Sequence, residues 1–162
     1  MGPLLWLDIE TTGLSEHQDL LLEVGMILTD EHLRVTASTS IVIGYNRIRE
    51  LMTNEFVLDM HKRNGLLDAV ERSDVTTLRA EQLLLEWVER HSADGFYMAG
   101  SGVHFDRRWL TRWMPALVRV WHYRNFDMTT LRYFFEEEKA TSDHRAIGDL
   151  KQNIADLRRL LG

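Results

Sequence analysis

Apolar residues in the first quarter of the chain form short runs divided by polar turns. The runs cover residues 4–9, 20–29 and 35–43 and are rich in Leu, Ile and Val. Runs of this length with polar boundaries are typical of strands, whereas a helix would need a longer amphipathic stretch. The three runs therefore predict an opening antiparallel meander.

Helical spacing of apolar residues begins after the third run. Residues 48–70 predict a broken helix, interrupted near Asn64-Gly65, and residues 76–91 predict a longer helix. The last helix has the clearest pattern, because its apolar residues recur every three or four positions. These residues are Ile147, Leu150, Ile154, Leu157 and Leu161.

Short strands and helices alternate between these two regions. We expect strands at residues 96–99 and 125–127, helices at residues 104–113 and 129–135, and a further short helix after Pro115. A meander followed by alternating helices and strands predicts an α/β fold with a central mixed five-stranded sheet flanked by helices. We found no linker and no internal repeat, so a single domain should span all 162 residues.

The composition narrows the class of protein. Hydrophobic residues make up 44% of the chain and charged residues 27%, which is ordinary for a soluble globular protein. No apolar run approaches the length of a membrane span and the first residues show no export signal, so we expect a cytoplasmic protein without a membrane partner. The chain has no cysteine, so any metal must be held by oxygen or imidazole nitrogen. The net charge of −6 argues against a broad basic surface for long nucleic acid.

Two carboxylates close the first predicted strand. Side chains alternate along a strand, so Asp8 and Glu10 project to one side and Ile9 to the other. Like charges held side by side repel each other, and their burial without a partner is costly. Either solvent or a cation must relieve this repulsion.

Further candidate residues lie at strand-to-helix junctions. Asp106 follows a glycine-rich turn, Asp127 precedes a predicted helix, and His144 and Asp149 lie near the start of the last helix. Each has an ordinary structural explanation. Asp106 and Asp127 are of the type that helix N-termini favour, and His144 alone fits a surface histidine. Taken singly, these short matches carry little information.

The order of these features resembles the three exonuclease motifs of the DEDDh family. The motifs are D-x-E on the first strand, an Asp before a helix, and H-x-x-x-x-D on the last helix. The resemblance extends over nearly the whole chain. It implies a ribonuclease H-like exonuclease fold and 3′-to-5′ hydrolysis of nucleic acid, which composition and periodicity alone do not indicate.

The resemblance also implies roles for five residues. Asp8, Glu10, Asp106 and Asp149 would bind two divalent cations, Mg²⁺ or Mn²⁺, which prefer hard oxygen ligands. Two such ions about 4 Å apart activate a water and stabilise the leaving oxygen of a phosphodiester. His144 would be the general base that takes the proton of this water, and histidine is suited to that work at neutral pH.

The spacing of His144 and Asp149 limits where the last helix begins. Five residues turn an ideal helix by about 500°, which points the two side chains roughly 140° apart. We therefore expect His144 before the helix or at its start, and Asp149 within it. Thr141, Ser142 and Asp143 support this boundary, because all three are residues that cap helices.

Among DEDDh exonucleases the sequence leans toward oligoribonuclease, which cuts very short RNA. Three segments are similar to that family: AGSGVHFDRRWLTRWMP, HYRNFDMTTL and SDHRAIGDL. The second discriminates best, because proofreading exonucleases generally lack it. The resemblance implies that short single-stranded RNA, down to dinucleotides, is hydrolysed to 5′-mononucleotides. The alternative is a DNA or single-strand exonuclease of the proofreading or RNase T kind.

The same resemblance implies a substrate pocket. Leu14 and Phe56 would contact the bases, Phe56 at a position where the family has a wedging tryptophan. Stacking on an aromatic ring contributes about 1–3 kcal/mol per base. His61 and Arg124 would cap the 5′ phosphate, and Tyr123 would lie at a dimer-related edge of the site. The ordinary alternatives are that Leu14 and Phe56 are core residues and that His61 lies on a solvated helix face.

Some positions depart from the oligoribonuclease pattern. Thr11 replaces a methionine, and Gly100-Ser101-Gly102 removes a serine that would contact phosphate. Thr129 aligns with a second phosphate-contacting serine and keeps the hydroxyl. A non-catalytic member that only binds nucleic-acid ends is a further alternative, which the intact set of five catalytic positions disfavours.

The resemblance finally implies a homodimer. Trp109, Trp113 and Trp121 are compatible with exposed interface residues. Tryptophans are nevertheless more often part of a core.

Overall fold

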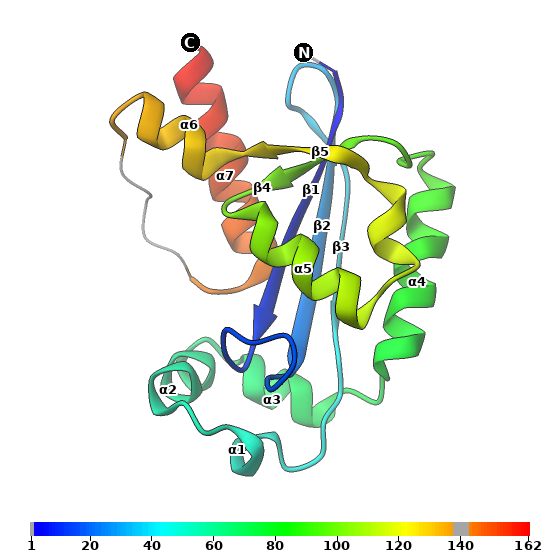
Figure 1. The fold of residues 1–162 in the computed structure, drawn as a ribbon, viewed down its shortest axis with the longest axis vertical. Helices are drawn as coiled ribbons and strands as arrows, with labels where there is room; N and C mark the ends of the chain where they lie inside the picture. The colour runs from blue at the N-terminus through cyan, green and yellow to red at the C-terminus, as the bar shows by residue number, and fades with distance from the viewer. Residues whose placement is uncertain (1, 138–142) are drawn as a thin grey trace.

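Five strands form one mixed sheet in the computed structural model, which describes residues 2–137 and 143–162 (Figure 1). The strands are Leu4–Thr11 (β1), Leu21–Thr29 (β2), Val35–Val42 (β3), Tyr97–Gly100 (β4) and His122–Asp127 (β5). β1, β2 and β3 are antiparallel neighbours, whereas β4 and β5 run parallel to β1. The order across the sheet is β3-β2-β1-β4-β5, so β1 is central. The predicted α/β fold with a mixed five-stranded sheet is confirmed.

Helices flank both faces of the sheet. In the described ranges they are Ile48–Leu51 (α1), Glu55–Arg63 (α2), Leu66–Arg72 (α3), Thr77–Arg90 (α4), Val103–Trp113 (α5), the 3₁₀ helix Leu117–Val120 (η1), Met128–Phe134 (α6) and Ala146–Leu161 (α7). α4 and α5 cover one face and α7 covers the other (Figure 1). None of these described helices is both long and apolar enough to cross a membrane.

The predicted broken helix is confirmed, and it has two breaks. Asn54 separates α1 from α2 and caps α2, because its side-chain oxygen accepts from the backbone N–H groups of Phe56 and Val57. The second break lies at the predicted Asn64-Gly65. Gly65 has φ of 77°, a left-handed conformation that glycine adopts without steric cost.

Side chains of β1 alternate between two buried clusters. Leu5 and Leu7 share a cluster with α4 and α5, whereas Trp6 shares one with α7. The same alternation continues to the end of the strand, so Asp8 and Glu10 face the α7 side.

The expectation of exposed tryptophans is wrong for Trp109 and Trp121. Both belong to the buried cluster between the sheet and α5. The indole N–H of Trp121 donates to the carbonyl of Leu5 at 3.0 Å. Trp113 is half-buried, and its N–H donates to the carbonyl of Glu16 at 3.0 Å. The large apolar area of each ring makes burial more favourable than exposure.

α7 approaches the sheet closely at Gly25, the β2 residue paired with Asp8. A Cβ atom on Gly25 would lie 2.6 Å from the Cβ of Ala146 and 3.2 Å from its carbonyl carbon. Carbon atoms in contact are ordinarily about 3.5–4.0 Å apart. The missing side chain therefore lets the first turn of α7 lie directly on the sheet.

Gly25→Ala should push the start of α7 away from β2. We expect a loss of about 1–3 kcal/mol in the free energy of unfolding, the usual range for overpacking. Urea denaturation measures this change, with Gly2→Ala as the control, because a Cβ on Gly2 would meet no atom within 4 Å. Equal stability of the two variants would contradict the close contact.

Candidate active site

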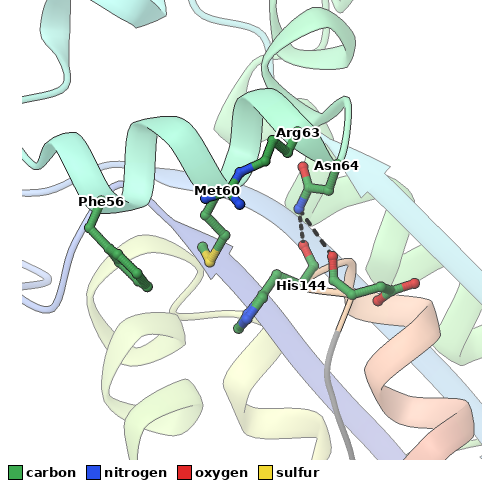
Figure 2. A pocket seen from close by; sticks show the side chains of 6 residues that line it. Phe56, Met60, Arg63, Asn64 and His144 are labelled. Carbon is green, nitrogen blue, oxygen red and sulfur yellow. Dashed lines mark hydrogen bonds between the residues drawn. The ribbon is translucent and has the colours of Figure 1, made fainter.

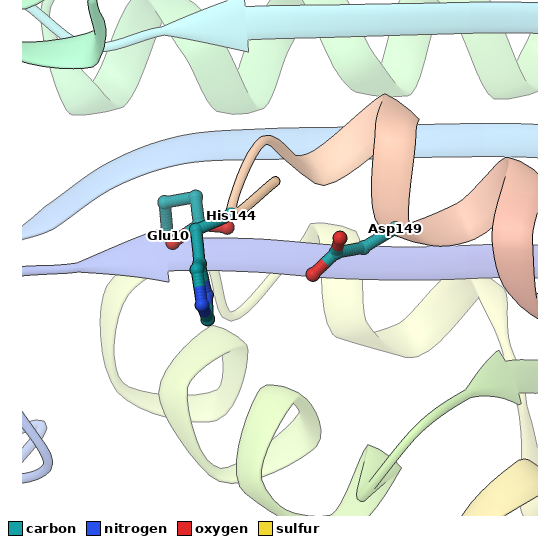
Figure 3. A group of neighbouring side chains, drawn as sticks. All are labelled: Glu10, His144 and Asp149. Carbon is teal, nitrogen blue, oxygen red and sulfur yellow. The ribbon is translucent and has the colours of Figure 1, made fainter. Parts of the chain in front are cut away.

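Glu10, His144 and Asp149 form one group beside the end of β1. One potential ligand atom from each lies within 4.8 Å of the others. Figure 3 shows the three side chains extending from β1, from the segment before α7 and from α7. Glu10 is 7% exposed and Asp149 6%, whereas His144 is exposed. Two buried carboxylates thus meet an accessible imidazole.

The predicted positions of His144 and Asp149 relative to the last helix are confirmed. α7 begins at Ala146, after His144, and Asp149 lies in its first turn. His144 has φ of 53°, a left-handed conformation that costs about 1–2 kcal/mol for a residue with a side chain. This non-helical backbone explains how the histidine joins Asp149, although a continuous helix would point them apart.

Of the three predicted capping residues, the structure describes Asp143. Thr141 and Ser142 lie outside the described residues. Asp143 is described, and its Oδ1 accepts from the backbone N–H of Arg145 at 3.1 Å. The residue at the cap position of α7 is Arg145, which makes no side-chain capping bond.

The other two predicted metal ligands lie on neighbouring elements. Asp8 is half-buried on β1, two residues before Glu10. Asp106 is 4% exposed in the first turn of α5, the helix that follows β4. Among the described residues, the group within 4.8 Å contains neither aspartate. Their role as ligands stays a prediction.

The donor set fits a divalent cation. Carboxylate oxygens are the ligands that Mg²⁺ and Mn²⁺ prefer. Glu10 and Asp149 are both buried, and two carboxylates brought together at low exposure repel each other. A cation between them offsets this repulsion.

A pocket of about 440 Å³ opens beside His144. Its other lining residues are Phe56, Met60, Arg63, Asn64 and Asp143. Phe56, Met60 and His144 point into the same space in Figure 2. Phe56 is 74% exposed, so the alternative that it is a core residue is wrong.

Met60, Arg63 and Asn64 were not among the predicted site residues. They follow Phe56 on α2 and at its end at spacings of four, seven and eight, which places them on the same helix face. That spacing was the available signal, but it identifies a pocket wall only when one residue of the wall is already known.

Leu14 is 79% exposed, so its core alternative is also wrong. The loop that carries it is tied to α5. Arg108 donates to the carbonyl of Leu14 at 3.2 Å and pairs with Glu16 at 2.8 Å. Trp113 also bonds to the carbonyl of Glu16. An apolar side chain is thus presented to solvent by an anchored loop.

His61 is fully buried, so the alternative that it lies on a solvated helix face is wrong. Its Nε2 donates to the carbonyl of Thr11 at 2.9 Å and lies 3.9 Å from a carboxylate oxygen of Glu10. Burial lowers the pKa of His61, although the bond to Thr11 opposes that shift. The structure therefore places His61 behind the site, supporting the end of β1, and not on the pocket wall.

Tyr123, Arg124 and Thr129 are exposed on β5 and at the start of α6. The Arg124 guanidinium lies over the Tyr123 ring, 5.2 Å from its centroid. None of the three lines the pocket beside His144. Asp127 is the cap of α6, because its Oδ1 accepts from the N–H of Thr129 at 2.8 Å, so the structural explanation holds for this residue.

Comparison with known proteins decides the family. Residues 5–155 match the RNase T family, described as exonuclease. The chain belongs to the RNase T exonuclease family. An oligoribonuclease of Chromobacterium violaceum is 35% identical over 166 residues, covering 96% of this chain and 91% of that protein. A probable oligoribonuclease of Dictyostelium discoideum is 31% identical over 164 residues, covering 96% and 86%.

Solved structures of exonucleases share the fold. The nuclease domain of 3′hExo, a DEDDh family member bound to rAMP, has a TM-score of 0.69 at 13% identity, covering 98% of this chain and 91% of that domain. Exonuclease I of E. coli in complex with a dT13 oligonucleotide has a TM-score of 0.64 at 14% identity. The chain spans 41% of the length of that exonuclease I. The predicted ribonuclease H-like exonuclease fold is confirmed.

Glu10→Gln and Asp149→Asn should remove cation binding. Each change keeps the size of the side chain but removes the negative charge on which a divalent ion depends. We expect saturating Mn²⁺ to raise the melting temperature of the wild type by about 5–10 °C and to leave both variants nearly unchanged. Thermal denaturation with and without Mn²⁺ measures this.

Glu31→Gln is the control, since Glu31 is exposed on the turn between β2 and β3, beside the C-terminal end of α7 and not beside its first turn. It should keep the full shift. An undiminished shift in the Glu10 and Asp149 variants would show that the ion binds elsewhere.

Proposed function

We propose that the protein is a 3′-to-5′ exoribonuclease that hydrolyses short oligoribonucleotides, down to dinucleotides, to 5′-mononucleotides. The observation that carries this proposal is the match to oligoribonucleases over 96% of the chain. The acids and histidine of the site support it, because Glu10, Asp149 and His144 come together. A cytoplasmic location is part of the proposal.

His144 takes the proton from the attacking water in this proposal. Its ring is exposed beside two buried carboxylates, so it can reach both solvent and the reacting phosphate. Asp8, Glu10, Asp106 and Asp149 would hold two divalent cations, Mg²⁺ or Mn²⁺. Such ions, when bound, supply water activation and stabilise the leaving oxygen.

Two exposed apolar side chains support binding of bases. Leu14 and Phe56 are 79% and 74% exposed, which is unfavourable for apolar groups unless a ligand covers them. Stacking of a base on Phe56 would contribute about 1–3 kcal/mol. The 440 Å³ pocket next to Phe56 falls in the range of about 300–1,000 Å³ that suits small ligands.

Contacts to the 5′ phosphate are a further part of the proposal. Arg124 and Thr129 offer a cation and a hydroxyl, and both are exposed. His61 is a candidate from resemblance only, since its ring is buried. Ser101 is unsuited to the task, because its hydroxyl donates to Asn153 at 2.8 Å and accepts from Arg132 at 2.7 Å.

A DNA exonuclease is the second candidate. The stretch from Asp8 to Leu14 is as similar to proofreading exonucleases as to oligoribonucleases. Gly102 also stands where the oligoribonuclease pattern has a phosphate-contacting serine, and the hydroxyl of Ser101 is already bonded to Asn153 and Arg132. The preference for RNA or DNA separates the two candidates.

Purified protein with Mn²⁺ or Mg²⁺ should hydrolyse labelled diribonucleotides faster than long RNA or long single-stranded DNA. His144→Ala should lower kcat by about 10²–10⁴-fold, the usual contribution of a general base. Asp8→Ala should abolish activity through loss of metal binding. Product release is followed by chromatography.

Faster turnover of long DNA would favour the DNA exonuclease. Full activity of both variants would overturn the assignment of the site, whereas no hydrolysis by the wild type with either metal would favour a non-catalytic role. His32→Ala is the control, because His32 is an exposed histidine on the turn between β2 and β3, outside the loop that carries Leu14.

We further propose that the protein acts as a homodimer through β5 and α6. Tyr123, Tyr133 and Phe134 are 73%, 88% and 77% exposed on these elements. Aromatic side chains of this kind are enriched in interfaces. β5 also lies at the edge of the sheet, where a second chain can cover it.

Mixed dimers test whether the partner supplies Tyr123. His144→Ala and Tyr123→Ala should each lose most dinucleotide hydrolysis alone. Coexpression should restore about a quarter of wild-type activity, since half of the dimers are mixed and each mixed dimer holds one intact site. No restoration, or a monomer by light scattering at micromolar concentration, would contradict this arrangement.

A further inference from the structure

His144 occupies a left-handed backbone conformation that its own sequence does not favour. Its φ is 53°, in a region that residues with a Cβ atom rarely adopt. Such a conformation persists only where surrounding contacts hold it. The contacts around residues 143–146 therefore show what keeps the histidine next to Asp149.

Asn64 holds the segment from the side of the substrate pocket. Its Nδ2 donates to the carbonyl of His144 at 2.7 Å and to that of Asp143 at 3.3 Å (Figure 2). Its Oδ1 accepts from the backbone N–H of Leu66 at 3.0 Å, at the start of α3. Both ends of the amide are engaged, so its orientation is fixed.

Glu23 holds the segment from the side of the sheet. This carboxylate is 2% exposed on β2 and receives two parallel bonds from Arg145, at 2.9 and 3.1 Å. Ser40 donates to it at 2.6 Å, and the backbone N–H of Ala146 lies 3.5 Å away. A two-point bond of this kind fixes the guanidinium in direction as well as in position.

We propose that Asn64 is a positioning residue that holds His144 for catalysis, together with the Glu23–Arg145 ion pair. Asn64 fixes the carbonyls at 143 and 144, and the ion pair fixes the next side chain. The carbonyls of Asp143 and His144 belong to the peptide groups before and after the Cα atom of His144, so bonds to both limit its backbone angles. The inference rests on the proposed function, because the residue that Asn64 positions is the proposed general base.

Asn64→Asp is the sharpest test. The change keeps size and shape and keeps the acceptor for Leu66, but it turns a carboxylate oxygen toward two carbonyl oxygens. We expect kcat for a diribonucleotide to fall by about 10- to 100-fold, part of the full contribution of a general base. The rise in melting temperature caused by Mn²⁺ should change less than about twofold, because the metal ligands are untouched. KM should rise by a smaller factor than kcat falls, because the new charge lies on the pocket wall but Leu14 and Phe56 are unchanged.

Asn54→Asp is the matched control. Asn54 lies at the other end of α2, and there the side chain only accepts, from Phe56 and Val57. The same substitution adds the same charge while keeping those bonds, so kcat should stay near the wild-type value. An unchanged kcat in Asn64→Asp would overturn the proposal, and so would equal losses in kcat, KM and Mn²⁺ response.

A second measurement separates this inference from the proposed function. NMR spectra of protein with ¹³C-labelled histidine report the His144 ring without any substrate, and His144→Ala identifies its signal. The signal should be shifted or split in Asn64→Asp and unchanged in Asn54→Asp. This result would support the positioning role even if the wild type cleaved no RNA, whereas identical spectra would overturn it.

If Asn64→Asp does not fold, as judged by the absence of a cooperative unfolding transition, Arg145→Lys replaces it in the same experiments. Lysine keeps the charge next to Glu23 but cannot form two parallel bonds. The expected result is the same selective loss of kcat and the same displaced His144 signal. Wild-type values for both would overturn the proposal.

Discussion

The packing of α7 against the centre of the sheet is the contact on which the rest of the site depends. β1 supplies Glu10 and α7 supplies Asp149, so the site exists only where two segments far apart in sequence meet. Leu150 and Ile154 share a buried cluster with Trp6 and hold the helix in place. Burial of each such side chain contributes about 1.5–3 kcal/mol, which offsets the repulsion among the acids gathered at its end.

Two buried glutamates show how neighbouring acids take different roles. Glu10 and Glu23 are directly opposite each other on β1 and β2, and both are almost fully buried. Like charges in such a pair destabilise a sheet. Arg145 neutralises Glu23 and makes it structural, whereas Glu10 joins His144 and Asp149. The sheet thus tolerates two glutamates opposite each other, because the charge of Glu23 is already balanced by the Arg145 guanidinium.

Local patterns in the sequence predicted the elements well, and tertiary contacts explain most of the differences. The meander, the break at Asn64-Gly65 and the start of the last helix after His144 follow from patterning and turn chemistry. β5 begins at His122, three residues earlier than predicted, because an exposed edge strand does not need apolar residues. The burial of His61 was not predictable, since it depends on a carbonyl fifty positions away.

Some residues of the candidate site were also predictable from the sequence, and others were not. The motif order placed Glu10, His144 and Asp149 together correctly, since each motif lies at the end of a predictable element. The supporting role of Asn64 was not visible, because its bonds to the backbone of residues 143 and 144 carry no side-chain pattern. Backbone contacts between distant segments leave little trace in the sequence.

α2 carries the pocket-facing Phe56 near its first turn and Asn64 just beyond its last residue. Eight residues separate them, which is about 12 Å along a helix axis. The regular rise of the helix therefore fixes the distance between Phe56 and the segment that carries His144. One inserted residue would turn Phe56 by about 100° relative to Asn64. The length of α2 thus sets the width of the pocket between the aromatic ring and the imidazole.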